Sequence, residues 1–249
     1  MEVFVQAVKY LIISAVPFEQ NKLTSKIKIT TEIESFGVLI KIGTINKTRV
    51  ALVIGGVGKV NTAHAVTLAL SLTKPERIVM VGCAGAYRHM GAKIGDVVLV
   101  EKEIYGDEGA ITQNGWRSIE EMNLPTVKKK NKIYYHIFPL DETLVAEIQS
   151  KYRKRKRKRE MDFKLRRGIA ITVSVCSKSN KRAEEMEALY PKAICESMEG
   201  AAAAQVAFLH NIPFFEIRGI SNIVGDRDFQ NWNIPLSVNN AQEILLLIL

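Results

Sequence analysis

Two short segments near the C-terminal end of the chain carry the side chains with the clearest chemical potential. In the first, Met198 and Glu199 precede Gly200 and a run of four alanines. A carboxylate beside such small residues indicates a pocket rather than a solvated face, and a buried carboxylate must find hydrogen-bond donors. The paired hydroxyl groups of a ribose would supply them. The alternative is that Glu199 only complements the positive end of a helix dipole.

The second segment runs from Arg218 to Asn222 and follows a buried strand that the apolar pattern predicts over residues 214–217. Asn222 carries an amide, which offers one acceptor oxygen and one NH₂ donor. Such a group is suited to reading the edge of a heterocyclic base, with Ser221 beside it. Together the two segments indicate the ribose-holding and base-reading halves of a nucleoside site.

A sheet with helices on both faces would position these segments, because apolar runs rich in β-branched residues alternate with helical patterns. The apolar runs predict buried strands at residues 11–16, 50–54, 77–81, 96–100, 169–175 and 214–217. Helices are predicted at residues 61–72, 199–210 and 237–249. The predicted fold class is α/β, a single-domain three-layer α/β/α architecture with a central mixed, partly parallel sheet. We expect one domain over residues 1–249, a length that can bury a substantial core.

Two glycine-rich stretches follow predicted strands. The first, residues 55–59, is neither a phosphate-binding P-loop nor a dinucleotide-binding motif, because its glycine spacing matches neither pattern and Val60 replaces the Ser or Thr of a P-loop. It is either a tight turn or part of a ligand site. The second, residues 82–86, would let the backbone approach a ligand closely at the carboxyl end of a strand. Packing explains its glycines equally well.

The composition excludes several classes of protein. No apolar run reaches the length of about 18 residues that a membrane-spanning helix needs, and residues 1–16 lack the features of a signal peptide. The three cysteines, Cys83, Cys176 and Cys195, and the four histidines show no metal-ligand spacing. We therefore expect a protein of the reducing cytoplasm without a zinc site.

The net charge of +9 belongs to one segment rather than to the whole chain. Residues 151–167 contain eleven Lys or Arg against Glu160 and Asp162, so the remainder of the chain is formally neutral. The segment predicts an exposed helix extension or a disordered loop, because like charges four residues apart repel each other in a helix. A nucleic-acid-binding protein that uses residues 151–159 is the alternative from another class. Only Tyr152 interrupts that run with an aromatic ring, so a solvated segment is favoured.

The order and spacing of these pieces resemble the nucleoside phosphorylase/nucleosidase superfamily from the first strand to about Asn240. Within that superfamily the chain resembles the futalosine hydrolases of one menaquinone pathway. Three features carry this resemblance: residues 196–202 (Glu-Ser-Met-Glu-Gly-Ala-Ala), residues 218–228, and Trp232 shortly after them.

A resemblance to the related methylthioadenosine/adenosylhomocysteine nucleosidases implies roles for individual residues. Glu19, just after the first strand, would activate the attacking water, and Met198 and Glu199 would hold the ribose hydroxyls. The residue that matches Asn222 is in those enzymes an aspartate that protonates N7 of adenine. The other positions implied to line the site are Cys83, Ala84, Gly85, Val175, Cys176 and Ser221.

The asparagine predicts a different base. Its NH₂ group can donate to O6 of a 6-oxopurine, whereas adenine presents an amino group there. We therefore expect hydrolysis of the N-ribosidic bond of a 6-oxopurine nucleoside, with futalosine giving dehypoxanthinyl futalosine and hypoxanthine. The alternatives are a methylthioadenosine/adenosylhomocysteine nucleosidase and a purine nucleoside phosphorylase. Water is favoured over phosphate as the nucleophile, because residues 15–19 lack the basic residue that phosphorylases of this superfamily place there.

Asparagine cannot supply a proton to the leaving base, and general acid catalysis contributes about 10²–10⁴-fold. Asp226 or Asp228 is the candidate acid, although Arg227 between them favours a structural ion pair. No metal or organic cofactor is needed for this chemistry. The resemblance implies a homodimer or larger homo-oligomer, and we expect neither a membrane nor a nucleic acid as partner.

Overall fold

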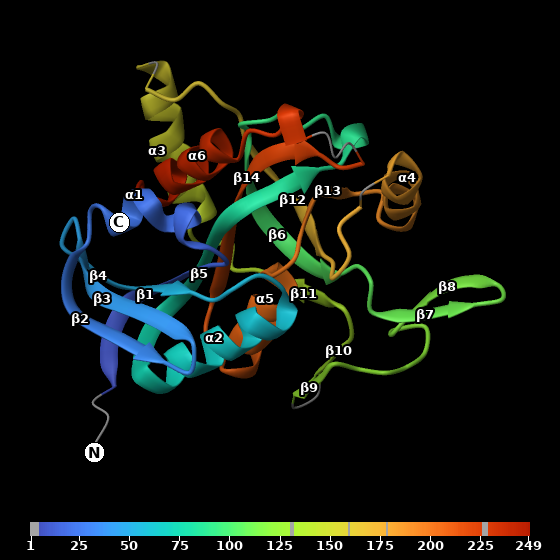
Figure 1. Ribbon diagram of the computed structural model, residues 1–249, viewed down its shortest axis with the longest axis horizontal. Helices are drawn as coiled ribbons and strands as arrows, with labels where there is room; N and C mark the ends of the chain where they lie inside the picture. Colours follow the sequence, from blue (N-terminus) through green and yellow to red (C-terminus); the bar gives the residue numbers. More distant parts are fainter. Residues whose placement is uncertain (1–4, 130–131, 159, 178, 226–228) are drawn as a thin grey trace.

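A mixed sheet organises the part of the chain that the computed structural model describes, residues 5–129, 132–158, 160–177, 179–225 and 229–249 (Figure 1). In chain order its strands are β1 (Gln6–Ser14), β2 (Lys28–Ser35), β3 (Val38–Ile45), β4 (Thr48–Ile54), β5 (Thr73–Ala86), β6 (Val97–Tyr105), β11 (Ile137–Pro139), β12 (Leu165–Thr172), β13 (Ala193–Ser197) and β14 (Phe214–Ile223). Two small hairpins lie outside it, β7 (Gly109–Thr112) with β8 (Gly115–Ser118), and β9 (Val127–Lys129) with β10 (Lys132–Tyr134).

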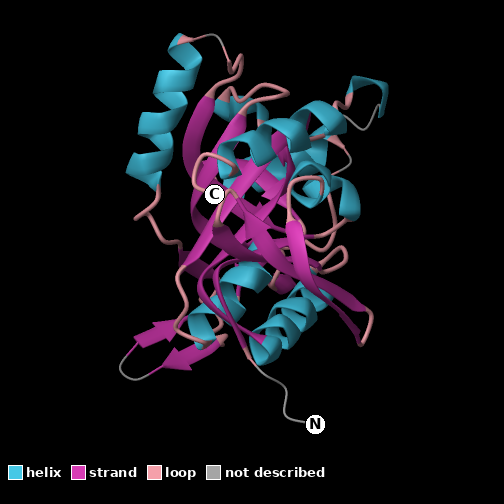
Figure 2. Ribbon diagram, turned by 90° about the vertical axis from the view of Figure 1, so that its left-hand side faces the viewer, coloured by secondary structure: helices cyan, strands magenta, loops and turns pink. Residues whose placement is uncertain are grey.

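Helices cover both faces of this sheet (Figure 2). They are α1 (Asn21–Thr24), α2 (Lys59–Leu72), α3 (Val145–Arg157), α4 (Asn180–Leu189), α5 (Gly200–Leu209) and α6 (Ile234–Leu245), with 3₁₀ turns at Pro17–Gln20, Arg88–Met90 and Phe229–Asn231. The two faces are visible in β1, because successive residues alternate between two apolar cores. Leu11 and Ile13 pack with α2 and α5, whereas Tyr10 and Ile12 pack with α3 and α6. The predicted α/β class with a central mixed sheet is confirmed.

Five strands of the sheet close into a ring of pairings. β5 pairs with β13 and β14, β14 also pairs with β6, and β12 pairs with both β6 and β13. β1 continues the sheet on the other side of β5 and pairs in parallel with β5 and β4. The carboxyl ends of strands that are far apart in the sequence therefore meet beside the end of β5.

Each of the six predicted strands differs from the observed strand at one end or at both, and three of these differences change the site. Residues 82–86, predicted to follow a strand as a loop, continue β5 to Ala86 because they pair with β13 and β14. Asn222, predicted to follow the strand at residues 214–217, lies within β14. The strand predicted at residues 169–175 already ends at Thr172. In each case tertiary pairing, rather than local composition, sets the boundary.

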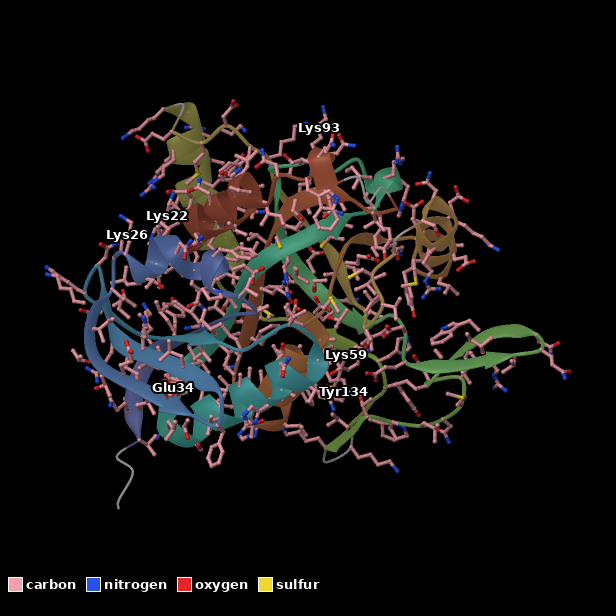
Figure 3. All side chains as sticks on the ribbon, viewed as in Figure 1. Lys22, Lys26, Glu34, Lys59, Lys93 and Tyr134 are labelled. Atoms are coloured by element: carbon pink, nitrogen blue, oxygen red, sulfur yellow. The ribbon has the colours of Figure 1, made fainter. Side chains whose placement is uncertain are left out.

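Only the first part of the basic segment is helical, because α3 ends at Arg157 and β12 begins at Leu165. α3 buries Tyr152, which donates a hydrogen bond to the carbonyl oxygen of Phe163, while Lys151 pairs with Glu147 one turn earlier. Residues 151–157 are therefore helical, whereas Arg159, at the end of the basic run, lies outside the described residues. Charged side chains also project from other parts of the surface, among them Lys26, Glu34 and Lys93 (Figure 3). Among the described residues, no helix is long and apolar enough to cross a membrane.

Candidate active site

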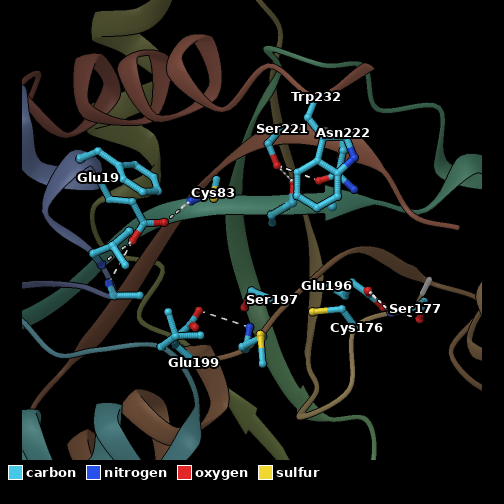
Figure 4. Close-up of a pocket in the computed structure, with 17 residues that line it drawn as sticks. Glu19, Cys83, Cys176, Ser177, Glu196, Ser197, Glu199, Ser221, Asn222 and Trp232 are labelled. Carbon is cyan, nitrogen blue, oxygen red and sulfur yellow. Dashed lines mark hydrogen bonds between the residues drawn. The ribbon is translucent and has the colours of Figure 1, made fainter. Parts of the chain in front are cut away.

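A cavity of about 260 Å³ opens where the carboxyl ends of β1, β5 and β14 meet the segment between β13 and α5. Ligands of open α/β sheets bind at such strand ends. The residues that line the cavity are Ala15, Val16, Phe18, Glu19, Val57, Cys83, Ala84, Gly85, Cys176, Ser177, Glu196, Ser197, Met198, Glu199, Ser221, Asn222 and Trp232. Glu19 and Glu199 lie at one end, and Asn222, Trp232, Cys176 and Glu196 lie at the other (Figure 4).

Glu19 is held by backbone groups on three sides. Its Oε1 accepts a hydrogen bond from the N–H of Cys83 (2.8 Å), and its Oε2 accepts from the N–H groups of Ala15 (2.9 Å) and Val16 (3.3 Å). Gly82 is required beside it, because a Cβ at that position would lie 2.6 Å from Oε1. Burial raises the pKa of Glu19 above its usual value, and the positive charge of Arg218 opposes that rise. The carboxylate is therefore fixed in place and is more basic than an ordinary glutamate.

Glu199 does not cap the helix that it precedes. It occupies the N-cap position of α5, yet its side chain makes no capping hydrogen bond. Instead its Oε1 accepts from the N–H of Gly58 (3.1 Å), and its Oε2 accepts from the N–H of Met198 (3.2 Å). The carboxylate faces the cavity beside the loop between β4 and α2 (Figure 4). The dipole-capping alternative is thus not what the geometry favours.

A buried guanidinium links the acidic residues of this end. Nη1 of Arg218 lies 3.4 Å from Oε2 of Glu199 and donates to the carbonyl oxygen of Cys83, whose N–H holds Glu19. Its Nε donates to Oε1 of Glu216 at 2.6 Å. Burial opposes the charge of Arg218, but the carboxylates of Glu216, Glu199 and Glu19 outweigh this and raise its pKa. Arg218 therefore stays charged and neutralises part of a dense acidic cluster.

A further carboxyl group, Glu103, lies behind Arg218 and is fully buried. Oε2 of Glu103 accepts a hydrogen bond from the hydroxyl of Thr172. Neither Oε1 of Glu103 nor Oε2 of Glu216 has a hydrogen-bond partner among the described residues. Burial, followed by the charge of Glu216, raises the pKa of Glu103 far above its usual value. A proton held by Glu103 therefore relieves the repulsion between two carboxyl groups. Gly200 makes room for the pair, because a Cβ there would lie 2.2 Å from Glu103 and 2.6 Å from Glu216.

At the other end of the cavity, Asn222 is oriented by its neighbour. The hydroxyl of Ser221 lies 2.8 Å from Oδ1 of Asn222 as a donor, and Nδ2 donates to the carbonyl oxygen of Ile223 at 3.3 Å. One hydrogen of the NH₂ group remains available for a ligand. The Ser221 hydroxyl also lies 3.2 Å from the carbonyl oxygen of Ala84, and an amide oxygen has two lone pairs, so Asn222 offers the cavity both an N–H donor and the remaining acceptor capacity of Oδ1.

The structure brings together most of the residues that the sequence singles out. The lining includes Glu19, Glu199, Asn222, Met198, Ser221, Cys83, Ala84, Gly85 and Cys176. Val175 is an exception: it is 69% exposed and does not line the cavity. The N–H groups of Ser174 and Val175 both bond to Asp107, and this anchoring leaves the Val175 side chain in solvent. Asp226 and Asp228 lie outside the described residues.

Several functional candidates escaped the sequence reasoning. Arg218 was part of a motif without a role, and Glu196, Ser177 and Ser197 were not assigned to the lining. The available signal was a charged residue inside an apolar strand, as in Phe-Phe-Glu-Ile-Arg at residues 214–218. A charge in such a place must be paired. Among the described residues, no group of His, Cys, Asp or Glu side chains is arranged to hold a metal ion.

Known proteins are similar to this chain in sequence and in fold. A sequence profile described as the phosphorylase superfamily matches residues 9–249. A 5′-methylthioadenosine/S-adenosylhomocysteine nucleosidase of Listeria monocytogenes is 30% identical over 212 residues, which cover 85% of this chain and 85% of that protein.

Two solved structures show the same fold. A 5′-methylthioadenosine/S-adenosylhomocysteine nucleosidase from Colwellia psychrerythraea, in complex with adenine, matches with a TM-score of 0.81 and 22% identity over 98% of this chain and 96% of that one. The native futalosine hydrolase of Helicobacter pylori matches with a TM-score of 0.77 and 17% identity over 98% of this chain and 97% of that one. The predicted enzyme class, an N-glycosyl hydrolase, is confirmed by the relatives. Since the superfamily profile spans almost the whole chain, this protein belongs to the phosphorylase superfamily.

Proposed function

We propose that this enzyme hydrolyses the N-ribosidic bond of a 6-oxopurine nucleoside, with futalosine as substrate and hypoxanthine as the released base. One observation carries the proposal: Asn222 lines the cavity, and its Nδ2 makes one recorded hydrogen bond within the described residues, to the carbonyl oxygen of Ile223, so its second N–H can be offered to a ligand. Such a donor matches the N7 and O6 acceptors of hypoxanthine. The 6-amino group of adenine would meet it donor against donor.

The ribose end of the cavity supports hydrolysis. Glu199 would accept hydrogen bonds from the 2′ and 3′ hydroxyls and stabilise the positive charge that develops on the sugar. Glu19, more basic than usual because it is buried, would remove a proton from the attacking water. Arg218 would position both carboxylates through its contacts with Glu199 and the backbone of Cys83. Interactions that strengthen as this charge develops lower the barrier.

The departing base would be stabilised by hydrogen bonding from Asn222, unless Asp226 or Asp228 supplies a proton. Hydrolysis rather than phosphorolysis is favoured, because Ala15, Val16 and Phe18 line the cavity next to Glu19 without a basic side chain. We place the reaction in menaquinone biosynthesis in the cytoplasm, where three cysteines without disulfides are expected. We further propose that the enzyme acts as a homo-oligomer.

A product assay tests this proposal. The enzyme is incubated separately with futalosine, inosine and methylthioadenosine, and the released base is identified with and without added phosphate. We expect hypoxanthine from futalosine at a rate that phosphate does not change. Ribose-1-phosphate products, or a rate proportional to the phosphate concentration, would instead make the enzyme a phosphorylase.

The identity of the base-reading residue is tested by Asn222→Asp. An aspartic acid can donate to N7 and accept from a 6-amino group, so activity should shift toward adenine nucleosides. We expect the ratio of inosine to methylthioadenosine kcat/KM to fall about 10²-fold or more, because a mismatched polar edge leaves buried groups unpaired. A ratio that stays unchanged would contradict this account of base selection.

A second candidate substrate class is the methylthioadenosine and adenosylhomocysteine of the nucleosidase from Listeria monocytogenes, to which this chain is 30% identical. That activity requires an acceptor for the 6-amino group at the base end of the cavity. The same product assay separates the two candidates, since release of adenine from methylthioadenosine with no hypoxanthine from futalosine favours the second.

A further inference from the structure

A second polar side chain faces the base end of the cavity, and the ribose chemistry does not use it. Glu196 lines the cavity and is 6% exposed. Its Oε1 accepts from the N–H of Ser177 (2.9 Å), and its Oε2 accepts from the hydroxyls of Ser177 (2.9 Å) and Tyr87 (2.8 Å). All three donors are neutral. Among the ion pairs formed by described residues, none includes Glu196.

The sheet places Glu196 opposite Asn222. Gly85 of β5 is the register partner of Glu196 in β13 and also of Asn222 in β14. Adjacent strands lie about 4.8 Å apart, so the two backbones are separated by about 10 Å across Gly85. Figure 4 shows the two side chains on opposite sides of the cavity. A planar base between them would meet the amide on one side and the carboxylate on the other.

The remaining hydrogen-bonding capacity of Glu196 is that of an acceptor. A carboxylate offers about four lone-pair directions, and three are taken by Ser177 and Tyr87. No donor from the described residues occupies the fourth, and it requires one because a buried carboxylate left short of donors is costly. Hypoxanthine carries such a donor, N1–H, beside O6. Adenine has a bare N1 lone pair in the same place, which a carboxylate repels.

We propose that Glu196 is a specificity-determining residue that accepts the N1–H of a 6-oxopurine base, while Asn222 donates to the O6 and N7 side. The proposal rests on the proposed function for the class of base, and it adds a second, independent hydrogen bond that recognises the base. Ser177 and Tyr87 hold the carboxylate in place. Selection against adenine then comes from two mismatches rather than one.

The test is equilibrium binding of free bases, which needs no turnover. Hypoxanthine, 1-methylhypoxanthine and adenine are titrated into the wild type and into Glu196→Gln by calorimetry. The matched control is Glu184→Gln, the same change at an exposed position of α4. We expect the wild type to prefer hypoxanthine over both other bases. That preference should fall about 10- to 100-fold in Glu196→Gln, the size expected for loss of one hydrogen bond to a charged group, and remain in the control.

The outcomes separate the two proposals. If the wild type prefers hypoxanthine and Glu196→Gln keeps that preference, the role of Glu196 is wrong while the proposed function stands. If the wild type prefers adenine, both are wrong. Should Glu196→Gln fail to fold, 1-methylhypoxanthine decides with the wild type alone. Binding as tight as that of hypoxanthine would mean that nothing accepts N1–H.

Discussion

The two ends of the cavity are built from different interactions. At the end proposed to hold the ribose, Arg218 pairs with Glu199, and burial raises the pKa of the nearby Glu19. At the end proposed to hold the base, Asn222 and Glu196 are held by neutral hydroxyl and backbone groups. Charged side chains can stabilise the charge that develops on the sugar only during the reaction. Neutral hydrogen-bonding groups instead distinguish bases by the positions of the donors and acceptors on the ring. Rate and selectivity are therefore expected to reside at opposite ends.

The largest effect should come from Glu19→Gln, which keeps the shape of the side chain and removes the proposed general base. We expect kcat to fall about 10²–10⁴-fold with little change in the preference among bases. In the wild type, kcat/KM should fall as the pH drops through a value above 4.5, because burial raises the pKa of Glu19. Steady-state rates from pH 4 to pH 9 measure both. If the variant shows the same fall of kcat/KM at low pH as the wild type, that fall belongs to a titrating group other than Glu19.

Removing the shared cation tests the charged end as a unit. Arg218→Gln leaves Glu19, Glu199 and Glu216 without the guanidinium, and breaking a buried ion pair costs about 3–5 kcal/mol of the free energy of unfolding. The pKa of Glu19 should rise further, because Arg218 lowers it in the wild type. Urea unfolding and the pH profile of kcat/KM are the measurements.

Arg218→Lys is the matched variant for that experiment. It keeps the charge and loses the fork that reaches Glu216, Glu199 and Cys83 at once. Stability should return in part, while the base preference stays that of the wild type in every folded variant. A change in base preference would show that the two ends are coupled rather than separate.

A smaller effect is expected behind the ribose end, at Glu103. Its folded-state pKa lies far above 4.5, so its contribution to stability is complete below pH 4.5 and is lost as the pH rises toward that raised value. The slope is at most about 1.4 kcal/mol per pH unit for one group. Glu103→Gln imitates the protonated acid and should gain stability relative to the wild type between pH 5 and pH 8. If the free energies of unfolding of the wild type and of Glu103→Gln differ by the same amount at every pH from 5 to 8, Glu103 is ionised in the folded protein.

The smallest effect is expected far from both ends, on α3. Deletion of residues 151–159 would remove the buried Tyr152, so neutralising the exposed Arg153, Lys154 and Arg157 together to Gln is the cleaner test. We expect kcat and base preference to be unchanged. A nucleic-acid-binding role would appear as salt-sensitive RNA or DNA binding in the wild type that the triple variant loses. Its absence at physiological salt would contradict the role.

The sequence predicts the local features well where a motif is short and continuous. The helix predicted at residues 199–210 is observed as α5, Gly200–Leu209, one residue shorter at each end, and Glu19 and Asn222 line the same cavity. The continuation of β5 through residues 82–86 was missed, because glycines read locally as a turn and only the partner strands make them a strand. Val175 and Cys176 are neighbours in sequence, yet the anchor to Asp107 turns only one of them away from the cavity.

The paired charges were harder to predict because their partners are distant in the sequence. Glu216 reads as an isolated charge in a predicted strand, whereas Glu103 lies beyond the strand predicted at residues 96–100. The two residues are 113 positions apart, and their meeting depends on the pairing of β6 with β14. The register that places Glu196 opposite Asn222 likewise depends on two different neighbours of β5. Composition and periodicity carry no information about such pairings.

The ring of strands also has a consequence for how the protein is made. The residues that line the cavity extend along the chain from Ala15 to Trp232. The carboxyl end of β5 is paired only when β13 and β14 have also folded. A chain still emerging from the ribosome cannot form the site until nearly all of it has been synthesised. Pairings so distant along the chain fold slowly. A bound base should therefore protect only full-length molecules from proteolysis, and fragments cut before β14 should gain nothing from it.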